Sequence, residues 1–377
     1  GVAQLVRARG SYPRSPGFES LHRHQPRPRE EARSLRLPSL VAAVDRALRA
    51  SGRPARGSAL VVGLSGGADS VALTDALAAL RRRRGFRLVA AHLDHGLRPG
   101  SADDATFCAE LCRRLDVSFR RGEADVRARA ARERGGLEQA ARRERYAFLR
   151  RVRDEERAAA IAVAHTRDDQ AETLLLRLLR GAGATGLAGM RPRAGDLLRP
   201  LLAVSREEVL AHLRERGLAW REDPSNADTA HRRNRVRHEL LPYLEERFNP
   251  AIRAALARTA GLLADEAAHV RREAEEHLAI ASRPEGEALV LARAPLAAAP
   301  TAVARAVLRQ ALLRTGGLAQ VGALHVERVL DLARAKAPSG RRLPLPGGRE
   351  VLFTRDEVRL EKRARPSAKA VSSPEET

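Results

Sequence analysis

The sequence has 377 residues, of which 44% are hydrophobic and only 3% aromatic, and its formal net charge is +22. At about 100–200 residues per domain, this length allows two or three domains, each with a core built mainly from Leu, Val and Ala. No apolar run approaches the roughly 20 residues that a membrane span requires, and no signal peptide is visible, so we expect a cytoplasmic protein that has no membrane partner.

The charge points to a class of partner. Nearly all the cations are arginines, and they outnumber the acids by a wide margin. Such an excess is typical of proteins that bind a phosphate-rich polymer, so the composition favours a nucleic acid. A basic surface that is merely solvated is the alternative.

The first segment, residues 1–38, has no helical or strand period and is rich in Pro, Arg and Gly, which predicts a disordered basic tail. Its stretches GVAQLVR and GFES are also what results from translating the D-arm and T-loop of a transfer-RNA gene. We therefore interpret the tail as a possible artefact of such a translation, with the true start between Arg33 and Ser39. Residues 364–377 are likewise predicted to be disordered.

From residue 39 onwards, strands and helices alternate. Short apolar runs bounded by turn residues predict buried parallel strands, each followed by a helical pattern, at 59–64, 86–96, 117–124, 158–165 and 195–202. This alternation predicts an α/β fold with a doubly wound, mainly parallel sheet. It stops near residue 240, so we place an α/β domain at 39–240, a helical domain at 241–338 and a small β segment at 339–363.

Two cysteines, Cys108 and Cys112, lie one helical turn apart in DDATFCAELCRRL, which reads as an amphipathic helix. They are expected to be small buried apolar residues, because a metal site would need further ligands nearby.

The stretch LSGGADS, Leu64–Ser70, follows the first predicted strand at its carboxyl end, where open parallel sheets bind ligands. Glycines let the backbone approach an anion closely, and the amides at the start of the following helix attract negative charge. The stretch lacks the lysine of a Walker A loop and the spacing of a dinucleotide fingerprint. Because Asp69 would repel a bound phosphate unless a divalent cation lay between them, the loop predicts a nucleotide with Mg²⁺. A plain tight turn is the alternative.

A group of acids follows the fourth predicted strand. Asp168, Asp169 and Glu172 lie at the start of a helix, and Asp169 and Glu172 share one helix face. Carboxylates there suit a substrate with positively charged amines. The alternative is that they only cap the helix electrostatically.

The sequence resembles a known family at several places. SGGADS is similar to the Ser-Gly-Gly-x-Asp-Ser pyrophosphate loop of the N-type ATP pyrophosphatases. Five later segments resemble one branch of that superfamily, the tRNA(Ile)-lysidine synthetases: HLDHGLR (92–98), EQAARRERY (138–146), HTRDDQAETLLLRLLRGAGATGLAGM (165–190), RPLL (199–202) and WREDPSNADTAHRRNRVRHELLP (220–242). The matches are in order and cover about residues 57–242.

The resemblance implies an ATP-dependent ligase with a catalytic domain at 39–240 and a tRNA-binding helical domain at 241–338. ATP adenylates the C2 oxygen of the wobble cytidine in an isoleucine tRNA with a CAU anticodon, and free L-lysine displaces AMP to give lysidine. The anticodon then reads AUA instead of AUG. ATP and Mg²⁺ are the implied cofactors, and a homodimer is a possible assembly.

The resemblance also implies roles for particular residues. Those expected to bind ATP are Ser65, Gly66, Gly67, Ala68, Asp69, Ser70, His92 and His165. Those expected to bind lysine and to be catalytic are Asp69, Asp169, Glu172 and Arg237. Asp69 is also the expected Mg²⁺ ligand. The residues expected to contact tRNA are Arg232, Arg233 and Arg235.

Several alternatives remain open at this point. A tRNA thiolase of the same fold is the nearest rival, although the chain lacks the Cys-x-x-Cys pairs typical of that class. A non-catalytic RNA-binding protein with an inactive nucleotide fold is another. His92, His95 and His165 could bind metal, but structural or adenosine-packing roles are favoured. Trp220 could stack on a base or pack in the core, and Arg81–Arg84 is more readily explained as a solvated helix end than as an RNA contact.

Overall fold

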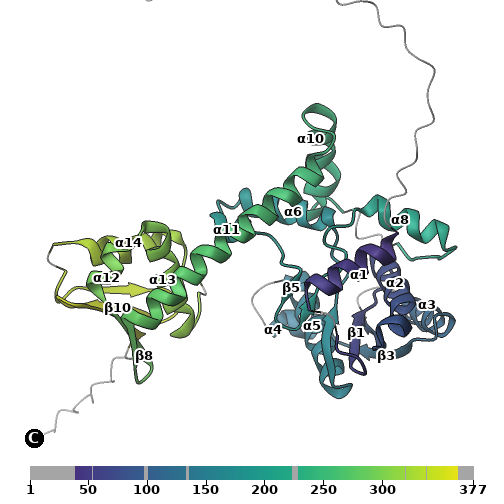
Figure 1. Ribbon diagram of the computed structural model, residues 1–377, viewed down its shortest axis with the longest axis horizontal. Helices are drawn as coiled ribbons and strands as arrows, with labels where there is room; N and C mark the ends of the chain where they lie inside the picture. The colour runs from purple at the N-terminus through teal and green to yellow at the C-terminus, as the bar shows by residue number, and fades with distance from the viewer. Residues whose placement is uncertain are drawn as a thin grey trace, which may run out of the picture. The chain divides into compact units, whose positions relative to one another are not determined.

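The computed structural model describes residues 39–52, 54–96, 101–132, 136–222, 228–318, 320–336 and 338–363 (Figure 1). The predictions for residues 1–38 and 364–377 concern segments that lie outside the described residues. Among the described helices, none combines the length and the apolar character needed to cross a membrane.

The N-terminal part of the chain forms a six-stranded sheet in the order β3-β2-β1-β4-β6-β5. Its strands are β1 (Ala59–Gly63), β2 (Arg87–Asp94), β3 (Ser118–Glu123), β4 (Ala158–Ala162), β5 (Arg193–Ala194) and β6 (Leu197–Leu198). All neighbouring pairs are parallel except β5 with β6. The predicted mainly parallel, doubly wound α/β fold is therefore confirmed.

Helices connect these strands and cover both faces of the sheet. They are α1 (Leu40–Ala50), α2 (Ala68–Arg84), α3 (Ser101–Arg114), α4 (Val126–Arg132), α5 (Gly136–Glu155), α6 (Arg167–Leu178), α7 (Ala184–Leu187) and α8 (Arg206–Glu215). Because successive side chains of a strand point to opposite faces, Leu60 and Val62 of β1 pack into the cluster with α1, α2 and α8, whereas Val61 packs against α5. This burial on both faces explains why the strands read as continuous apolar runs.

The fifth predicted strand is much shorter than expected. Only Leu197–Leu198 pairs with β4, although the pattern predicts an extended segment over 195–202. Pro200 has no N–H to donate to a neighbouring strand, and the chain turns immediately afterwards, with Leu202 N bonded to Arg199 O and Val204 N bonded to Leu201 O. A proline inside an apolar run is the sequence signal for this early end.

A helical stretch follows the sheet. It consists of α9 (Arg232–Arg235), a π-helical turn η2 (Val236–Leu240), α10 (Leu241–Arg247) and the long helix α11 (Ile252–Ala281). A small apolar cluster joins α6 to η2 and α10 through Ala171, Leu175, Val236 and Leu241. Helix α11 contacts α6 near its beginning and α13 (Thr301–Arg314) further along (Figure 1).

The rest of the described chain forms a second sheet, which is antiparallel, in the order β7-β8-β11-β10-β9. Its strands are β7 (Ser282–Glu285), β8 (Ala288–Ala292), β9 (Arg342–Leu345), β10 (Arg349–Phe353) and β11 (Glu357–Lys362). The helices α12 (Arg293–Ala298) and α14 (Ala323–Arg334) accompany α13. We expected residues 339–363 to form a small β unit of their own. The sheet to which they belong is larger, because β11 also pairs with β8. Alternate residues such as Phe353 and Leu360 bury one face of this sheet in a core shared with α13 and α14.

Candidate active site

The glycine loop connects β1 to α2 and folds back onto the first turn of that helix. Ser65 N donates to Ser70 Oγ (3.1 Å), and Ser70 Oγ donates to Gly67 O (2.8 Å). Gly66 has φ +84°, a left-handed conformation that favours glycine. No side chain caps α2 at Gly67, so the first amides of this helix are not satisfied by a cap. The loop thus presents backbone N–H groups at the positive end of a helix, as anion sites do.

Asp69 lies in the first turn of the same helix. Its carboxylate forms an ion pair with Arg206, whose Nη1 lies 2.6 Å from Oδ1. Burial raises the pKa of Asp69, the charge of Arg206 opposes that rise, and the charge of Asp169 adds to it. The Asp69 carboxylate is therefore within electrostatic reach of the acids that follow β4, the strand next to β1.

Asp169 has two functions at once. Its Oδ2 accepts from Thr166 N (2.8 Å), which closes a capping box at the start of α6. Its Oδ1 accepts from Arg233 Nη2 (2.7 Å). Burial alone would raise its pKa, but Arg233, the Thr166 amide and other nearby cations prevail and lower it. Helix capping and a place in the site, which the sequence leaves as alternatives, are combined in this one side chain.

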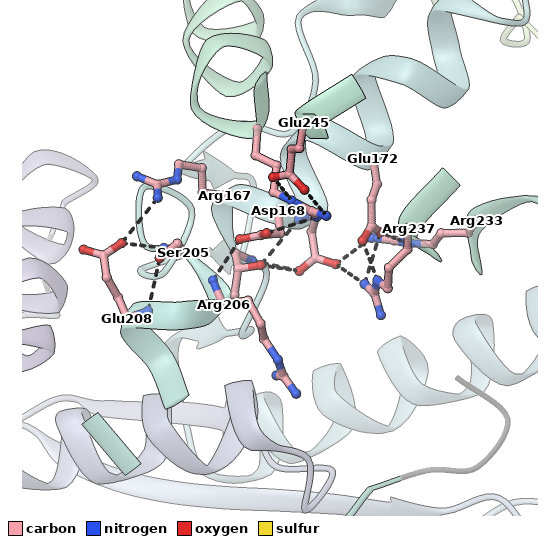
Figure 2. Close-up of polar contacts among 12 residues, drawn as sticks. Arg167, Asp168, Glu172, Ser205, Arg206, Glu208, Arg233, Arg237 and Glu245 are labelled. Carbon is pink, nitrogen blue, oxygen red and sulfur yellow. Dashed lines mark hydrogen bonds and ion pairs between the residues drawn. The ribbon is translucent and has the colours of Figure 1, made fainter. Parts of the chain in front are cut away.

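Glu172, one turn further along α6, is fully buried and is held by two arginines. Arg233 Nε lies 2.7 Å from its Oε2, and Arg237 Nε lies 2.5 Å from its Oε1. Figure 2 shows both guanidinium groups directed at this carboxylate. Arg237 also reaches Asp169 Oδ1 (3.3 Å). The acid pair Asp169 and Glu172 is thus neutralised by cations from α9 and η2.

The structure brings two further arginines to the site that sequence reasoning does not single out. Arg206, at the start of α8, donates its backbone N–H to Asp168 Oδ2 (2.8 Å) while its side chain pairs with Asp69. Arg253 of α11 places Nη1 3.2 Å from Asp168 Oδ1 and Nε 2.7 Å from Glu245 Oε1. No motif marks either arginine, because the contacts depend on how distant helices pack.

The three histidines are placed differently. His92 is buried, and its Nδ1 lies 2.9 Å from Leu64 O, so this side chain supports the glycine loop from β2. Burial lowers the pKa of His95. Burial also lowers the pKa of His165, which follows β4, to about 3, so the His165 imidazole is neutral. The described residues contain no cluster of three His, Cys, Asp or Glu side chains that could hold a metal ion.

Cys108 and Cys112 are buried free thiols, as expected, and burial raises the pKa of each to about 12.

Trp220 is half-buried and packs against the core of the first sheet. The basic run at the end of α2 is largely engaged in ion pairs, with Arg84 and Arg83 bound to Asp45 and Arg81 to Asp116.

The arginines predicted to contact tRNA divide into two groups. Arg233 is bound to the site carboxylates, whereas Arg232 and Arg235 are exposed on α9. His231, just before α9, is exposed as well.

Comparison with known proteins agrees with this geometry. Residues 40–244, more than half of the chain, match the PP-loop domain, and residues 291–361 match the TilS substrate binding domain. The chain is similar to tRNA(Ile)-lysidine synthases from Geobacter sulfurreducens (45% identity over 79% of this chain and 64% of that protein) and Thermus thermophilus (51%, over 63% and 46%). It is also similar to that of Thermobifida fusca (48%, over 60% and 67%).

The chain spans about half to two thirds of the length of these relatives. The matched region includes the glycine loop, the acids after β4 and the arginines of α9 and η2. The chain belongs to the tRNA(Ile)-lysidine synthase family and carries its PP-loop domain at residues 40–244.

Proposed function

We propose that the protein ligates free L-lysine to C2 of the wobble cytidine in an isoleucine tRNA with a CAU anticodon, at the expense of ATP. The observation that supports this most strongly is an acid group at the glycine loop: the Asp69 carboxylate feels the charge of Asp169, which shares its arginine partners with Glu172. An anion cradle next to a cluster of acids suits a reaction that joins a phosphate-bearing substrate to a diamine.

In the first step, the C2 oxygen of the cytidine attacks the α-phosphate of ATP, and pyrophosphate leaves. The backbone amides of the loop and of the first turn of α2 would hold the pyrophosphate part of ATP. Ser65 and Ser70 offer hydroxyl groups at the same place. His92 keeps the loop in position through its contact with the Leu64 carbonyl.

The residues fit a Mg²⁺ ion at this point. Magnesium is commonly held by one or two carboxylates together with substrate phosphates, and Asp69 is a half-buried carboxylate adjoining the loop. When bound, the ion would neutralise phosphate charge. Asp69 would have to exchange its ion pair with Arg206 for the metal.

In the second step, the ε-amine of lysine attacks C2, a C–N bond forms, and AMP leaves with the C2 oxygen. The α-ammonium of lysine would lie against the carboxyl groups of Asp169, which is half-buried, and Glu172, which is buried. Arg237 would be close enough to meet the lysine carboxylate. The attacking amine must be neutral, so a carboxylate nearby would accept its proton.

The cysteines argue against the rival activity, tRNA thiolation. A thiolate is the reactive form of cysteine, and a thiol whose pKa is about 12 stays protonated at neutral pH. Both side chains are also buried.

The test is lysine incorporation. Purified protein, Mg·ATP and labelled lysine are incubated with an isoleucine tRNA transcript that carries CAU, using Asp69→Asn and, as a matched control, the exposed Asp116→Asn. We expect label in the tRNA with the wild type and with Asp116→Asn, but not with Asp69→Asn or without ATP. If the tRNA binds but acquires no label, the proposal is wrong, and thiolation or mere RNA binding would be examined next.

A further inference from the structure

Two aromatic side chains, one on α10 and one directly after it, are exposed although aromatic residues make up only 3% of the chain. The exposed fractions are 54% for Tyr243 and 70% for Phe248, and no other aromatic among the described residues ranks as an exposed large hydrophobic. The two rings contact each other edge to face, with centroids 5.7 Å apart and planes at 64°. A pair of this kind leaves most of both rings open to a ligand.

Helix α10 is fixed next to the candidate active site. Leu241, at its start, is fully buried in the small cluster that includes Ala171 and Leu175 of α6. Glu245 binds Arg253, which in turn reaches Asp168 at the start of α6 (Figure 2 labels Glu245 and Asp168). The helix of the aromatic pair is therefore held against α6, which carries the site carboxylates.

Two exposed arginines lie on the helical stretch that leads to this pair, which also carries the exposed acids Glu239 and Glu246. Arg232 and Arg235 are exposed on α9 and form no ion pair with an acid in the described part of the chain. Residues 232–247 are helical throughout, so Arg235 lies about 12 Å along the helical stretch from Tyr243, at 1.5 Å per residue. Of the residues between Arg235 and Tyr243, Arg237 points inwards to Glu172, whereas His238 and Glu239 are exposed.

We propose that Tyr243 and Phe248 form a stacking platform for unpaired bases of an RNA loop, with Arg232 and Arg235 contacting its phosphates. This inference rests on the proposed function, because the RNA would be the loop that presents its base to the active site. Exposed aromatic rings beside arginines suit single-stranded RNA, whose bases stack on such rings irrespective of sequence. A second copy of this strongly basic chain is less suitable, since unpaired arginines would face one another.

Fluorescence anisotropy of a labelled anticodon stem-loop RNA, titrated with the full chain, tests the platform. Phe248→Ala and Tyr243→Ala are each expected to weaken RNA binding about tenfold, the loss of stacking on one base. Phe248→Trp should bind like the wild type, and Phe248→Leu should bind like Phe248→Ala, because leucine is apolar but has no aromatic face. Ile280→Ala is the matched control, since Ile280 is a similarly exposed apolar residue on α11, outside both matched domains.

Two results would overturn the inference. One is RNA binding by Phe248→Leu, or by both alanine variants, that equals that of the wild type. The other is a wild-type dimer that Phe248→Ala dissociates with unchanged RNA affinity, as sedimentation would show, which would assign the pair to contact between copies. Lysine incorporation is measured separately: a chain that incorporates no lysine but binds RNA through these rings would refute the proposed function and leave the platform supported.

Discussion

Arg233 Nε lies 2.7 Å from Glu172 Oε2, so a guanidinium group that is one third exposed neutralises a carboxylate that is completely buried. Arg233 also bonds Asp169, and Arg237 takes the second oxygen of Glu172. The carboxylates proposed to receive a lysine ammonium group are thus already occupied by cations of the chain itself. A substrate amine must displace one of them, and Arg233 belongs to the short helix α9 at the beginning of the basic stretch.

Removing Arg233 should therefore strengthen lysine binding to the free protein. In Arg233→Ala, Arg237 is the one arginine of the described residues that stays bonded to Glu172 and Asp169. The carboxyl charge that is no longer compensated attracts an ammonium group more strongly. We expect calorimetry to show a lysine dissociation constant several times lower than that of the wild type. Arg235→Ala, on the same helix but outside the acid cluster, should leave the constant unchanged. Weaker lysine binding by Arg233→Ala would mean that this arginine contacts the substrate instead.

The glycine loop allows a comparison between two glycines with the same φ angle. Gly66 and Gly57 both have φ +84°, and an added Cβ would meet only ordinary contacts at Gly66 and nothing at Gly57. Either alanine variant should lose about 1–2 kcal/mol of stability from the left-handed conformation. Only Gly66→Ala should lose the ability to release pyrophosphate from ATP, because its loop amides shift. Equal activity of the two variants would show that the conformation at Gly66 is not needed.

His165 should make the stability of the fold depend on pH. Burial is the main cause that lowers its pKa, to about 3, with Arg199 and Arg142 nearby acting in the same direction and Asp169 opposing them. In the unfolded chain its pKa is about 6.5, so between these values the unfolded state binds the proton and the folded state does not. Stability therefore falls as the pH drops below about 6.5, by up to about 1.4 kcal/mol per pH unit.

The variant His165→Gln should flatten that part of the profile. Urea unfolding at a series of pH values, with the exposed His269→Gln as control, measures the difference between the curves. A wild-type profile that stays parallel to that of His165→Gln between about pH 4 and pH 6.5 would show that His165 is not held neutral by the fold.

The two cysteines should be dispensable for chemistry. Cys108→Ala/Cys112→Ala removes two buried side chains, which should cost about 1–2 kcal/mol of stability per site. Lysine incorporation at a temperature where the variant is folded should match that of the wild type. Loss of activity in a fully folded double variant would indicate a cysteine-dependent reaction and revive the thiolase alternative.

Much of the fold follows from local patterns. The runs in β1 and β4 predict buried strands because both faces of a parallel sheet are covered. Ser205 and Glu208 have the spacing of a capping box, and the structure has that box at the start of α8. The prediction of 195–202 as a strand is wrong in extent, since Pro200 and the turn after it interrupt the pairing. The C-terminal sheet is larger than predicted because the pairing of β11 with β8 joins segments far apart in the chain.

The sequence by itself determined which chemical groups the chain possesses: the glycine loop, the acids after the fourth strand and the arginines of RRNRVR each stand within one short stretch. Only the tertiary structure decided which of them meet. Arg206 reaches Asp69 because α8 packs beside α2, and Arg233 reaches Glu172 because α9 packs beside α6. Side-chain pairing over such separations depends on the packing of whole helices, which no local pattern of residues encodes.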